Sequence, residues 1–444
     1  MVGFVRLAGA LFLSIAILQT GTGLFGTFLP VRMDLEAFSP TVIGLIGSSY
    51  FAGFILGSLF CDRLLAAVGH IRAFAGLAAL VCSVAILIGL EVNPWTWGAL
   101  RLVNGLCIAG LFLVIESWLN SSVSNEGRGR LFAFYMSISY TALGAGQFLV
   151  GTWPAKGPEL FMLAALFYAF SLVPLALSPR SNPIPYERHS FGLRRLIAVS
   201  PLGMAGCLIA GVILGAFYSL MPVTIRGLGL GVEVVARFMG FAILFGLVMQ
   251  WPLGKLSDIF DRRKILTLMA FAVAGAAGAL ALLATRGELT LLVLAGFFGA
   301  TVFTLYPISV AHANDYAGPA DVVPLTAGLL VAYGVGAAFG PTLAAGVVEA
   351  TGPQGVFLFS AVAAALLGLF ALFRMTRREA VPLEEQGPFV PLLRTSVASA
   401  ELSPLIDEEA LASDVGEGTA GTNDDDEEVP AEAEPGTVAG GPGR

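Results

Sequence analysis

Residues 73–92 read AFAGLAALVCSVAILIGLEV, an apolar run that contains a single charged side chain, Glu91. Twelve runs of this kind, each roughly 18–24 residues long, follow one another between Leu7 and Phe373 and are separated by short polar loops. Each run is long enough to cross a hydrocarbon core of about 30 Å as a helix. Because a segment in lipid has to satisfy its own backbone hydrogen bonds, helices are the expected structure. The sequence therefore predicts an all-α membrane protein with twelve transmembrane helices.

The composition supports this prediction. The chain is 56% hydrophobic and 12% charged, whereas a soluble domain carries about 25% charged residues. Its 54 glycines suit membrane helices that pack through small residues, and GxxxG spacing occurs at Gly53–Gly57, Gly211–Gly215 and Gly336–Gly340. The expected spans are approximately 8–30, 41–61, 73–92, 96–118, 129–152, 158–177, 198–221, 232–253, 264–285, 288–311, 322–349 and 353–374.

The longest polar break inside the body lies at residues 178–197 and contains three prolines. It divides the chain into a six-helix bundle at 1–177 and a second one at 198–378, with a cytoplasmic loop between them. Transporters built from repeats commonly place the binding site between such halves, near the middle of the bilayer.

Residues 379–444 form an acidic tail that carries 16 acidic and 2 basic side chains, although the whole chain has a net charge of only −7. Residues 424–428 are an uninterrupted acidic block. This composition predicts disorder. The tail is either a solubilising extension or a regulatory, partner-binding arm.

The distribution of basic residues predicts the orientation. With the N-terminus placed inside, the inner segments hold 16 Lys and Arg residues and the outer loops hold 5, which places both termini in the cytoplasm. The first apolar run continues to Pro30 and has no clear cleavage site. We therefore interpret it as a membrane helix and not as a signal peptide.

The loop after the eighth run reads GKLSDIFDRRK, beginning at Gly254. A glycine, then Asp258, then the basic cluster with Arg262 and Arg263, resembles the loop signature of the major facilitator superfamily. Asp261 stands where that pattern has a glycine. The resemblance implies the major facilitator fold of two pseudo-symmetric six-helix bundles, and a cytoplasmic charge network that locks one conformation. The alternative is that these basic residues only set the topology.

The equivalent loop of the first half matches the signature less well. Gly69 and Arg72 resemble its end, but the acidic position is occupied by Ala66, and Asp62 lies one helical turn earlier. The resemblance assigns the lock of this half to Asp62 and Arg72. Arg130, in the loop after the fourth run, is expected to belong to the same conformational gate.

The fourth run contains Arg101, followed by Asn104, Gly105 and Ala109. This spacing resembles the fourth-helix motif of the superfamily, with Asn104 in place of a Gln-like residue. An arginine inside a membrane helix costs at least about 2.5–3.5 kcal/mol and normally faces a wet cavity or a partner. The resemblance implies that Arg101 binds substrate or couples transport to protons; a purely structural role is the alternative.

Glu116 lies fifteen residues beyond Arg101, about 22 Å along the helix, so the two side chains cannot pair directly. It is either part of a gate or structural ion pair near Arg130, or a carboxylate that carries the transported proton. In the resembled family, the first, fourth, seventh and tenth helices line the cavity. This implies substrate contacts for Gln19, Asn104, Tyr218 and Tyr306, although each could instead make an interhelical hydrogen bond.

Several further segments are similar to the bacterial YcaD-like branch of the superfamily. They are SSYF at 48–51, Glu116-Ser117, GRGRL at 127–131, QWP at 250–252 and FTLYP at 303–307. This branch implies a transporter of the bacterial inner membrane without a settled substrate.

The sequence thus favours a secondary active transporter of a small polar or anionic solute, which works by alternating access, is coupled to protons and acts as a monomer. No nucleotide-binding motif, nucleic-acid-binding pattern or cofactor motif is present, and the three histidines and four cysteines lack metal-ligand spacing. An enzyme is therefore not expected. The alternative function is a non-transporting receptor or sensor that signals through the acidic tail.

Overall fold

The computed structural model describes residues 2–121, 125–178, 196, 198–318, 321–387 and 389, without the side chains of residues 2–8, 121 and 125–130. The described residues are helical and contain no strand. Eleven of their helices are long and apolar enough to cross a membrane. The twelfth long helix, α5, has described side chains only from Leu131 onward.

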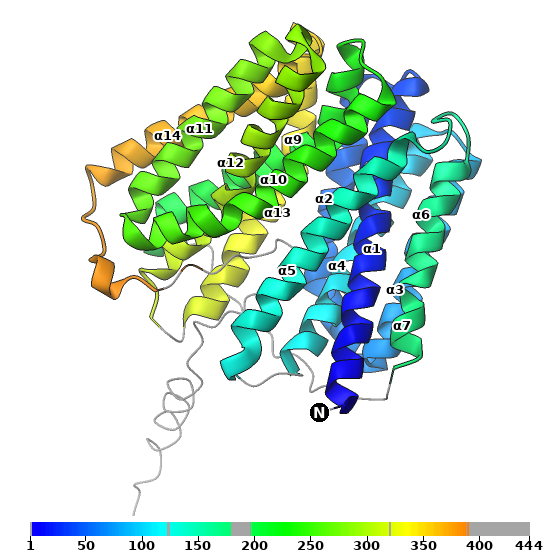
Figure 1. The fold of residues 1–444 in the computed structure, drawn as a ribbon, viewed down its shortest axis with the longest axis horizontal. Coiled ribbons are helices and arrows are strands. Elements are labelled where there is room, and N and C mark those ends of the chain that lie inside the picture. Colours follow the sequence, from blue (N-terminus) through cyan, green and yellow to red (C-terminus); the bar gives the residue numbers. More distant parts are fainter. Residues whose placement is uncertain are drawn as a thin grey trace, which may run out of the picture. The chain divides into compact units, whose positions relative to one another are not determined.

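Figure 1 draws the helices of the first half in blue to blue-green. They are α1 (Val2–Leu35), α2 (Pro40–Val68), α3 (His70–Leu90), α4 (Pro94–Ser121), α5 (Asn125–Gln147), and α6 (Glu159–Phe170) continued by α7 (Leu172–Ala176). A 3-10 turn, η1 (Phe148–Gly151), follows α5. The predicted break at 178–197 lies almost wholly outside the described residues, so the predicted division into bundles stays a prediction.

The second half contains six more long helices, which are α9 (Pro201–Gly227), α10 (Val232–Ile259), α11 (Arg262–Leu283), α12 (Glu288–Asn314), α13 (Val322–Thr351) and α14 (Gly355–Met375). Short 3-10 turns follow α11 at Ala284–Arg286 and α14 at Leu383–Glu385. We call the end of the bundle where α1 begins, with the turns at Gly69 and Asp261, the N-side. The opposite end, with the turns that follow Leu35 and Gly227, is the far side.

Local sequence explains where several helices begin and end. Ser39 accepts a hydrogen bond from the Val42 N–H, and Pro40 occupies the first turn of α2. Ser200 caps α9 in the same way, ahead of Pro201. Gly69 joins α2 to α3 with φ of 79°, a conformation that a side chain would strain.

The predicted close packing through small residues is present. A Cβ atom at Gly53 of α2 would collide with the Leu102 carbonyl oxygen of α4, and one at Gly105 of α4 would collide with the Tyr50 carbonyl oxygen of α2. Gly211 and Gly336 make the same reciprocal approach between α9 and α13. These backbones touch because neither helix carries a side chain at the crossing.

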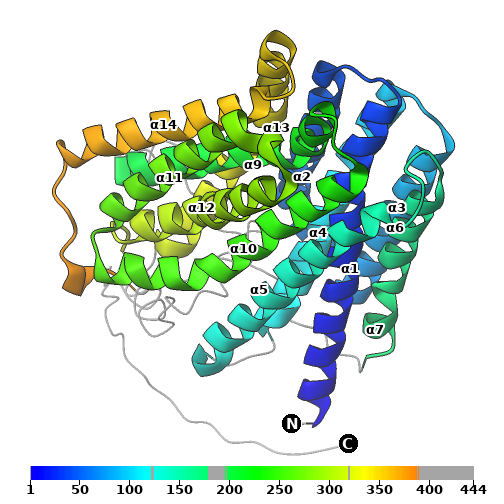
Figure 2. The same ribbon diagram turned by 45° about the horizontal axis from the view of Figure 1, so that its top comes forward.

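The two halves meet where α2 packs on α13, where α5 packs on α10, and where α1 and α2 pack on α9 (Figure 2). Their polar links lie in the far-side part of the helices. Arg226 Nε lies 2.6 Å from Asp34 Oδ2, and the hydroxyls of Ser48 and Thr342 are 2.8 Å apart. The far-side ends of the halves are therefore joined by directed contacts as well as by packing.

Candidate functional site

A cavity of about 150 Å³ lies between the two halves and is lined by α1, α2, α4, α5, α6, α9 and α13. Most of its wall is aromatic or aliphatic. The polar and aromatic residues that line it include Gln19, Phe25, Thr27, Tyr50, Arg101, Asn104, Tyr140, Gln147, Tyr168, Tyr218, Ser219 and Tyr333.

Among the described residues, Arg101 brings the only cationic side chain to this wall. Its guanidinium carbon lies 4.2 Å from the centroid of the Tyr50 ring and 5.6 Å from that of Phe25. Its Nη1 donates to Asn104 Oδ1 over 2.8 Å. No carboxylate of the described residues pairs with Arg101. A guanidinium in an apolar cavity, held by a ring and an amide but not neutralised, attracts negative charge.

Two buried polar atoms at the cavity have no hydrogen-bond partner among the described residues. They are Nδ2 of Asn104, which is a donor, and Oε1 of Gln19, which is an acceptor. Leaving such an atom unpaired costs about 1–3 kcal/mol. A ligand with an acceptor near Arg101 and a donor near Gln19 would satisfy both atoms.

Some of the predicted substrate contacts line the cavity and one does not. Arg101, Asn104, Gln19 and Tyr218 line the cavity. Tyr306 is buried in α12 and its ring packs against the Tyr333 ring, with a centroid distance of 5.2 Å, so it lies outside the cavity wall. Sequence reasoning did not select the lining residues Tyr50 and Tyr168, because a tyrosine in an apolar run equally suits helix packing.

Glu116 is fully buried in α4 and accepts a hydrogen bond from the Tyr135 hydroxyl of α5 over 2.7 Å. It is not among the residues that line the cavity. The side chain of Arg130, its predicted neighbour, lies outside the described residues. Glu116 therefore links α4 to α5 on the N-side of the cavity.

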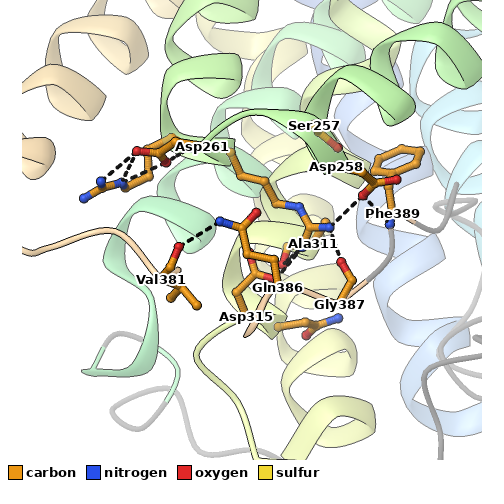
Figure 3. A network of polar contacts seen from close by, with 12 residues as sticks. Ser257, Asp258, Asp261, Ala311, Asp315, Val381, Gln386, Gly387 and Phe389 are labelled. Carbon is orange, nitrogen blue, oxygen red and sulfur yellow. Dashed lines mark hydrogen bonds and ion pairs between the residues drawn. The ribbon is translucent and has the colours of Figure 1, made fainter. Parts of the chain in front are cut away.

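The predicted gate of the second half forms a charge network at the N-side (Figure 3). Arg262 is buried, and its Nη2 lies 3.0 Å from Asp258 Oδ1. Its Nη1 forms an ion pair with Asp315, at the end of α12, and donates to the Ala311 carbonyl oxygen over 3.3 Å. The network thus ties the N-side ends of α10, α11 and α12 together. Asp315 was not predicted as a member because it is distant in sequence.

Asp261, which departs from the family pattern, begins α11 as its N-cap. Its carboxylate accepts from the Arg263 backbone N–H over 2.9 Å and lies 2.7 Å from Arg263 Nη2. Burial acts to raise the pKa of Asp261, but the hydrogen bonds and charge of Arg263 outweigh it and lower the pKa below its usual value. Arg263 also donates to the Arg378 carbonyl oxygen over 2.6 Å.

Gly254 contacts a segment that follows α14. A Cβ atom at Gly254 would collide with the ring of Phe389, and the Phe389 N–H donates to Asp258 Oδ1 over 2.7 Å. In the first half, Asp62 is half-buried and accepts from the Arg63 N–H over 2.8 Å. Arg72 is exposed and forms no ion pair with any described residue. The structure therefore does not pair Asp62 with Arg72.

Comparison with known proteins gives a consistent result. The sequence profile of the Major Facilitator Superfamily matches residues 11–322. The chain is 29% identical over 341 residues to the uncharacterized MFS-type transporter YcaD of Salmonella newport (strain SL254), covering 76% of this chain and 87% of that protein.

Two solved structures show the same fold at low identity. The nucleoside transporter NupG superposes with a TM-score of 0.68 at 14% identity, covering 85% of this chain and 100% of that one. A bacterial homolog of the human lysosomal transporter Spinster, in an inward-facing and occupied conformation, superposes with a TM-score of 0.68 at 13% identity. The match covers 86% of this chain and 97% of that one.

Proposed function

Because this chain belongs to the Major Facilitator Superfamily, and so is a membrane transporter rather than an enzyme, we propose that it carries a small organic anion or polar solute by proton-coupled alternating access. The observation that supports this most strongly is Arg101, a cation without a described carboxylate partner, in a cavity between the two halves. A guanidinium there offsets part of the cost of moving an anion from water into an otherwise apolar site.

The cavity also limits the class of solute. Its aromatic wall favours a ligand with an apolar or ring-shaped body, and an apolar cavity of about 150 Å³ can accommodate a benzene-sized group. The unpaired atoms of Asn104 and Gln19 add one donor and one acceptor. A small organic acid with an additional hydrogen-bond donor satisfies all three features.

Alternating access requires a state in which the cavity is closed on one side. The contacts Asp34–Arg226 and Ser48–Thr342 support closure at the far side. We infer that the N-side is cytoplasmic, in a bacterial inner membrane, because basic side chains are concentrated there. They include Arg63, Arg72, Lys255, Arg262, Arg263, Lys264, Arg374, Arg377 and Arg378. In that orientation the structure corresponds to an inward-facing carrier, and a monomer is sufficient for it.

Glu116 is our candidate for the proton-carrying residue. It is a fully buried carboxylate with a hydroxyl donor, Tyr135, and it stands on the same helix as Arg101. Ionisable groups inside membrane spans commonly mark ion pathways. Coupling then requires that protonation of Glu116 and binding at Arg101 favour the same conformation, because a ligand shifts an equilibrium only by its differential affinity for the two states.

The test is thermal unfolding of the purified protein against a panel of organic acids and neutral analogues, at pH 5.5 and 7.5. A ligand at 100 times its dissociation constant stabilises the folded state by about 2.7 kcal/mol. We expect an anionic ligand to stabilise the wild type but not Arg101→Ala. Arg237→Ala is the matched control, because Arg237 pairs with Glu288, has a side chain that is 41% exposed and does not line the cavity.

Proton coupling is tested by measuring uptake of the same organic acids into proteoliposomes at both pH values. Glu116→Gln is expected to keep binding and to lose the pH dependence of uptake. Retained stabilisation in Arg101→Ala would refute the binding site, and an unchanged pH dependence in Glu116→Gln would refute the assignment of the proton carrier.

A further inference from the structure

The segment that follows α14 returns to the N-side end of the second half instead of leaving it. We call residues 379–387 and 389 the strap. At its base, Arg378 Nη1 donates to the Val199 carbonyl oxygen over 2.7 Å, and the guanidinium lies 3.7 Å from the Tyr316 ring centroid. Within the strap, Gln386 Nε2 donates to the Val381 carbonyl oxygen over 2.9 Å. The strap is therefore a folded turn.

The far end of the strap is anchored in the charge network (Figure 3). The Gly387 carbonyl oxygen accepts a hydrogen bond from Arg262 Nη2. The Phe389 N–H donates to Asp258 Oδ1, the same oxygen that pairs with Arg262. The strap thus occupies hydrogen-bonding groups of the predicted gate that could otherwise bind another element.

Phe389 also fills a specific space. Its ring rests against the bare backbone of Gly254, so closely that a Cβ atom at position 254 would overlap the Cδ1 and Cε1 atoms of the ring. The contact requires glycine on α10 and a flat side chain on the strap. The strap is therefore held at one position on α10 by its hydrogen bonds to Asp258 and Arg262 and by the packing of Phe389 on Gly254.

That place adjoins the surface of α10 that faces the other half. Leu244 of α10 touches Gly144 of α5, since a Cβ atom at Gly144 would lie 2.8 Å from Leu244 Cδ2. At about 100° per residue, Val248 and Trp251 continue the same face toward the N-side. Their exposed fractions are 62% and 70%. Asp258 is only about 40° around the helix from the Leu244 direction.

On α5 the corresponding face continues through Ser137, which is exposed, seven residues before Gly144. Bringing the N-side ends of α5 and α10 together would cover Ser137 and Trp251. The Phe389 ring stands at the edge of that closing surface, because it is held by Asp258 and Gly254.

We propose that the strap is an internal wedge that holds the N-side of the cavity open, so that its release from Gly254 and Asp258 is needed before α5 and α10 can close. This inference rests on alternating access as the proposed function. It adds that the tail-proximal segment, outside the cavity, sets the balance between the two states. Release also frees Asp258 and one nitrogen of Arg262 to bind the closing half.

The experiment measures the distance between spin labels at Ser137→Cys and Val248→Cys in the full-length protein in lipid nanodiscs. The background has its four free cysteines, Cys61, Cys82, Cys107 and Cys207, replaced by alanine. We expect Phe389→Ala to raise the ratio of closed to open N-side about tenfold, which corresponds to about 1.4 kcal/mol. Leu383→Ala is the matched control, because Leu383 lies on the strap but is 48% exposed.

Gly254→Val is a second variant that should release the strap. The valine side chain would occupy the space of the Phe389 ring, so the contact is broken from α10 instead of from the strap. It should shift the ratio in the same direction, and the double variant should add little, because both changes remove one contact. Identical distance distributions in the wild type and in Phe389→Ala would overturn the proposal, as would an equal shift in Leu383→Ala.

The outcomes also separate the wedge from the transport mechanism. If a ligand from the panel closes the N-side in the wild type but Phe389→Ala has no effect, alternating access stands and the wedge fails. If the labels approach each other in no variant and with no ligand, both proposals fail.

Discussion

At the scale of single residues, the ring of Tyr50 holds the guanidinium of Arg101 in place. The ring centroid lies 4.2 Å from the guanidinium carbon, at the cavity wall. A cation over an aromatic face gains about 0.5–2 kcal/mol. Tyr50→Leu is therefore expected to weaken binding of the anionic panel ligand roughly 2- to 30-fold. Tyr50→Phe keeps the ring and should bind as the wild type, as measured by titration calorimetry.

The contrary result would be equal loss of affinity in Tyr50→Phe and Tyr50→Leu. It would mean that the hydroxyl, and not the ring, contributes to binding. Equal affinity in all three proteins would mean that the Tyr50 ring does not position the Arg101 guanidinium.

Single residues also show which parts of the site a sequence can reveal. Arg101 and Glu116 stand out because a charge inside an apolar run is costly and needs a reason. Tyr50 carries no such cost, and its role depends on α1 and α4 bringing Phe25 and Arg101 to the same wall. Asp315 joins Arg262 only because α12 ends beside α11. Such partnerships arise from tertiary packing and leave no local pattern.

At the scale of helices, the crossing of α2 and α4 depends on the absence of a side chain at Gly53. A Cβ atom there meets the Leu102 carbonyl oxygen, and overpacking typically costs about 1–3 kcal/mol. We expect Gly53→Ala to lower the melting temperature. Gly278→Ala is the matched control within α11, where a Cβ atom meets nothing within 4 Å, and it should gain about 0.4–1 kcal/mol. Equal shifts in both variants would contradict a crossing determined by backbone contact.

The start of α11 gives a prediction about pH. The pKa of Asp261 is lower in the folded protein than in the unfolded chain, so its contribution is fully present above the unfolded value and is lost as pH falls through the folded one. We expect Asp261→Asn to be less stable than the wild type at pH 7, by about 1 kcal/mol or less, because asparagine still caps a helix. The difference should shrink as pH falls through the pKa of Asp261 in the folded protein, which lies below its usual value. Thermal unfolding of both proteins from pH 7 downward measures it, and a difference that does not change with pH would contradict it.

Hydropathy predicts the existence and order of the helices better than their ends. The apolar run at 41–61 marks the part expected in lipid, whereas α2 continues to Val68, where Gly69 ends it. The expected span at 158–177 is divided at Ser171 into α6 and α7. The ends depend on capping residues and on polar turns that extend beyond the hydrocarbon region. The pattern of apolar residues does not report these features.

At the scale of the whole molecule, the sequence predicts the fold, but it does not predict which ends of the two halves are in contact. The rhythm of apolar runs, together with the resemblance of the loop after α10 to its family signature, predicts two six-helix bundles. Which ends of the bundles are joined does not follow, because under the proposed alternating access one sequence adopts both arrangements. On that proposal, the far-side contacts of Asp34 and Ser48 belong to one state, and their energy must be small enough to be broken during transport.

The ion pair Asp34–Arg226 makes that argument testable. It joins α1 to α9 at 2.6 Å, with the two side chains 28% and 23% exposed, and pairs with such exposure contribute about 0.2–1 kcal/mol. Asp34→Asn should therefore increase the ratio of open to closed far side by up to about fivefold. Spin labels at Ala37→Cys and Glu233→Cys would report the change as a longer distance.

Arg237→Gln is the control, because Arg237 and Glu288 form an ion pair at 2.7 Å within the second half. The exchanged pair Asp34→Arg with Arg226→Asp should restore the original ratio. If Asp34→Asn and Arg237→Gln changed the distance equally, the far side would be closed by packing of α2 on α13 and not by this ion pair.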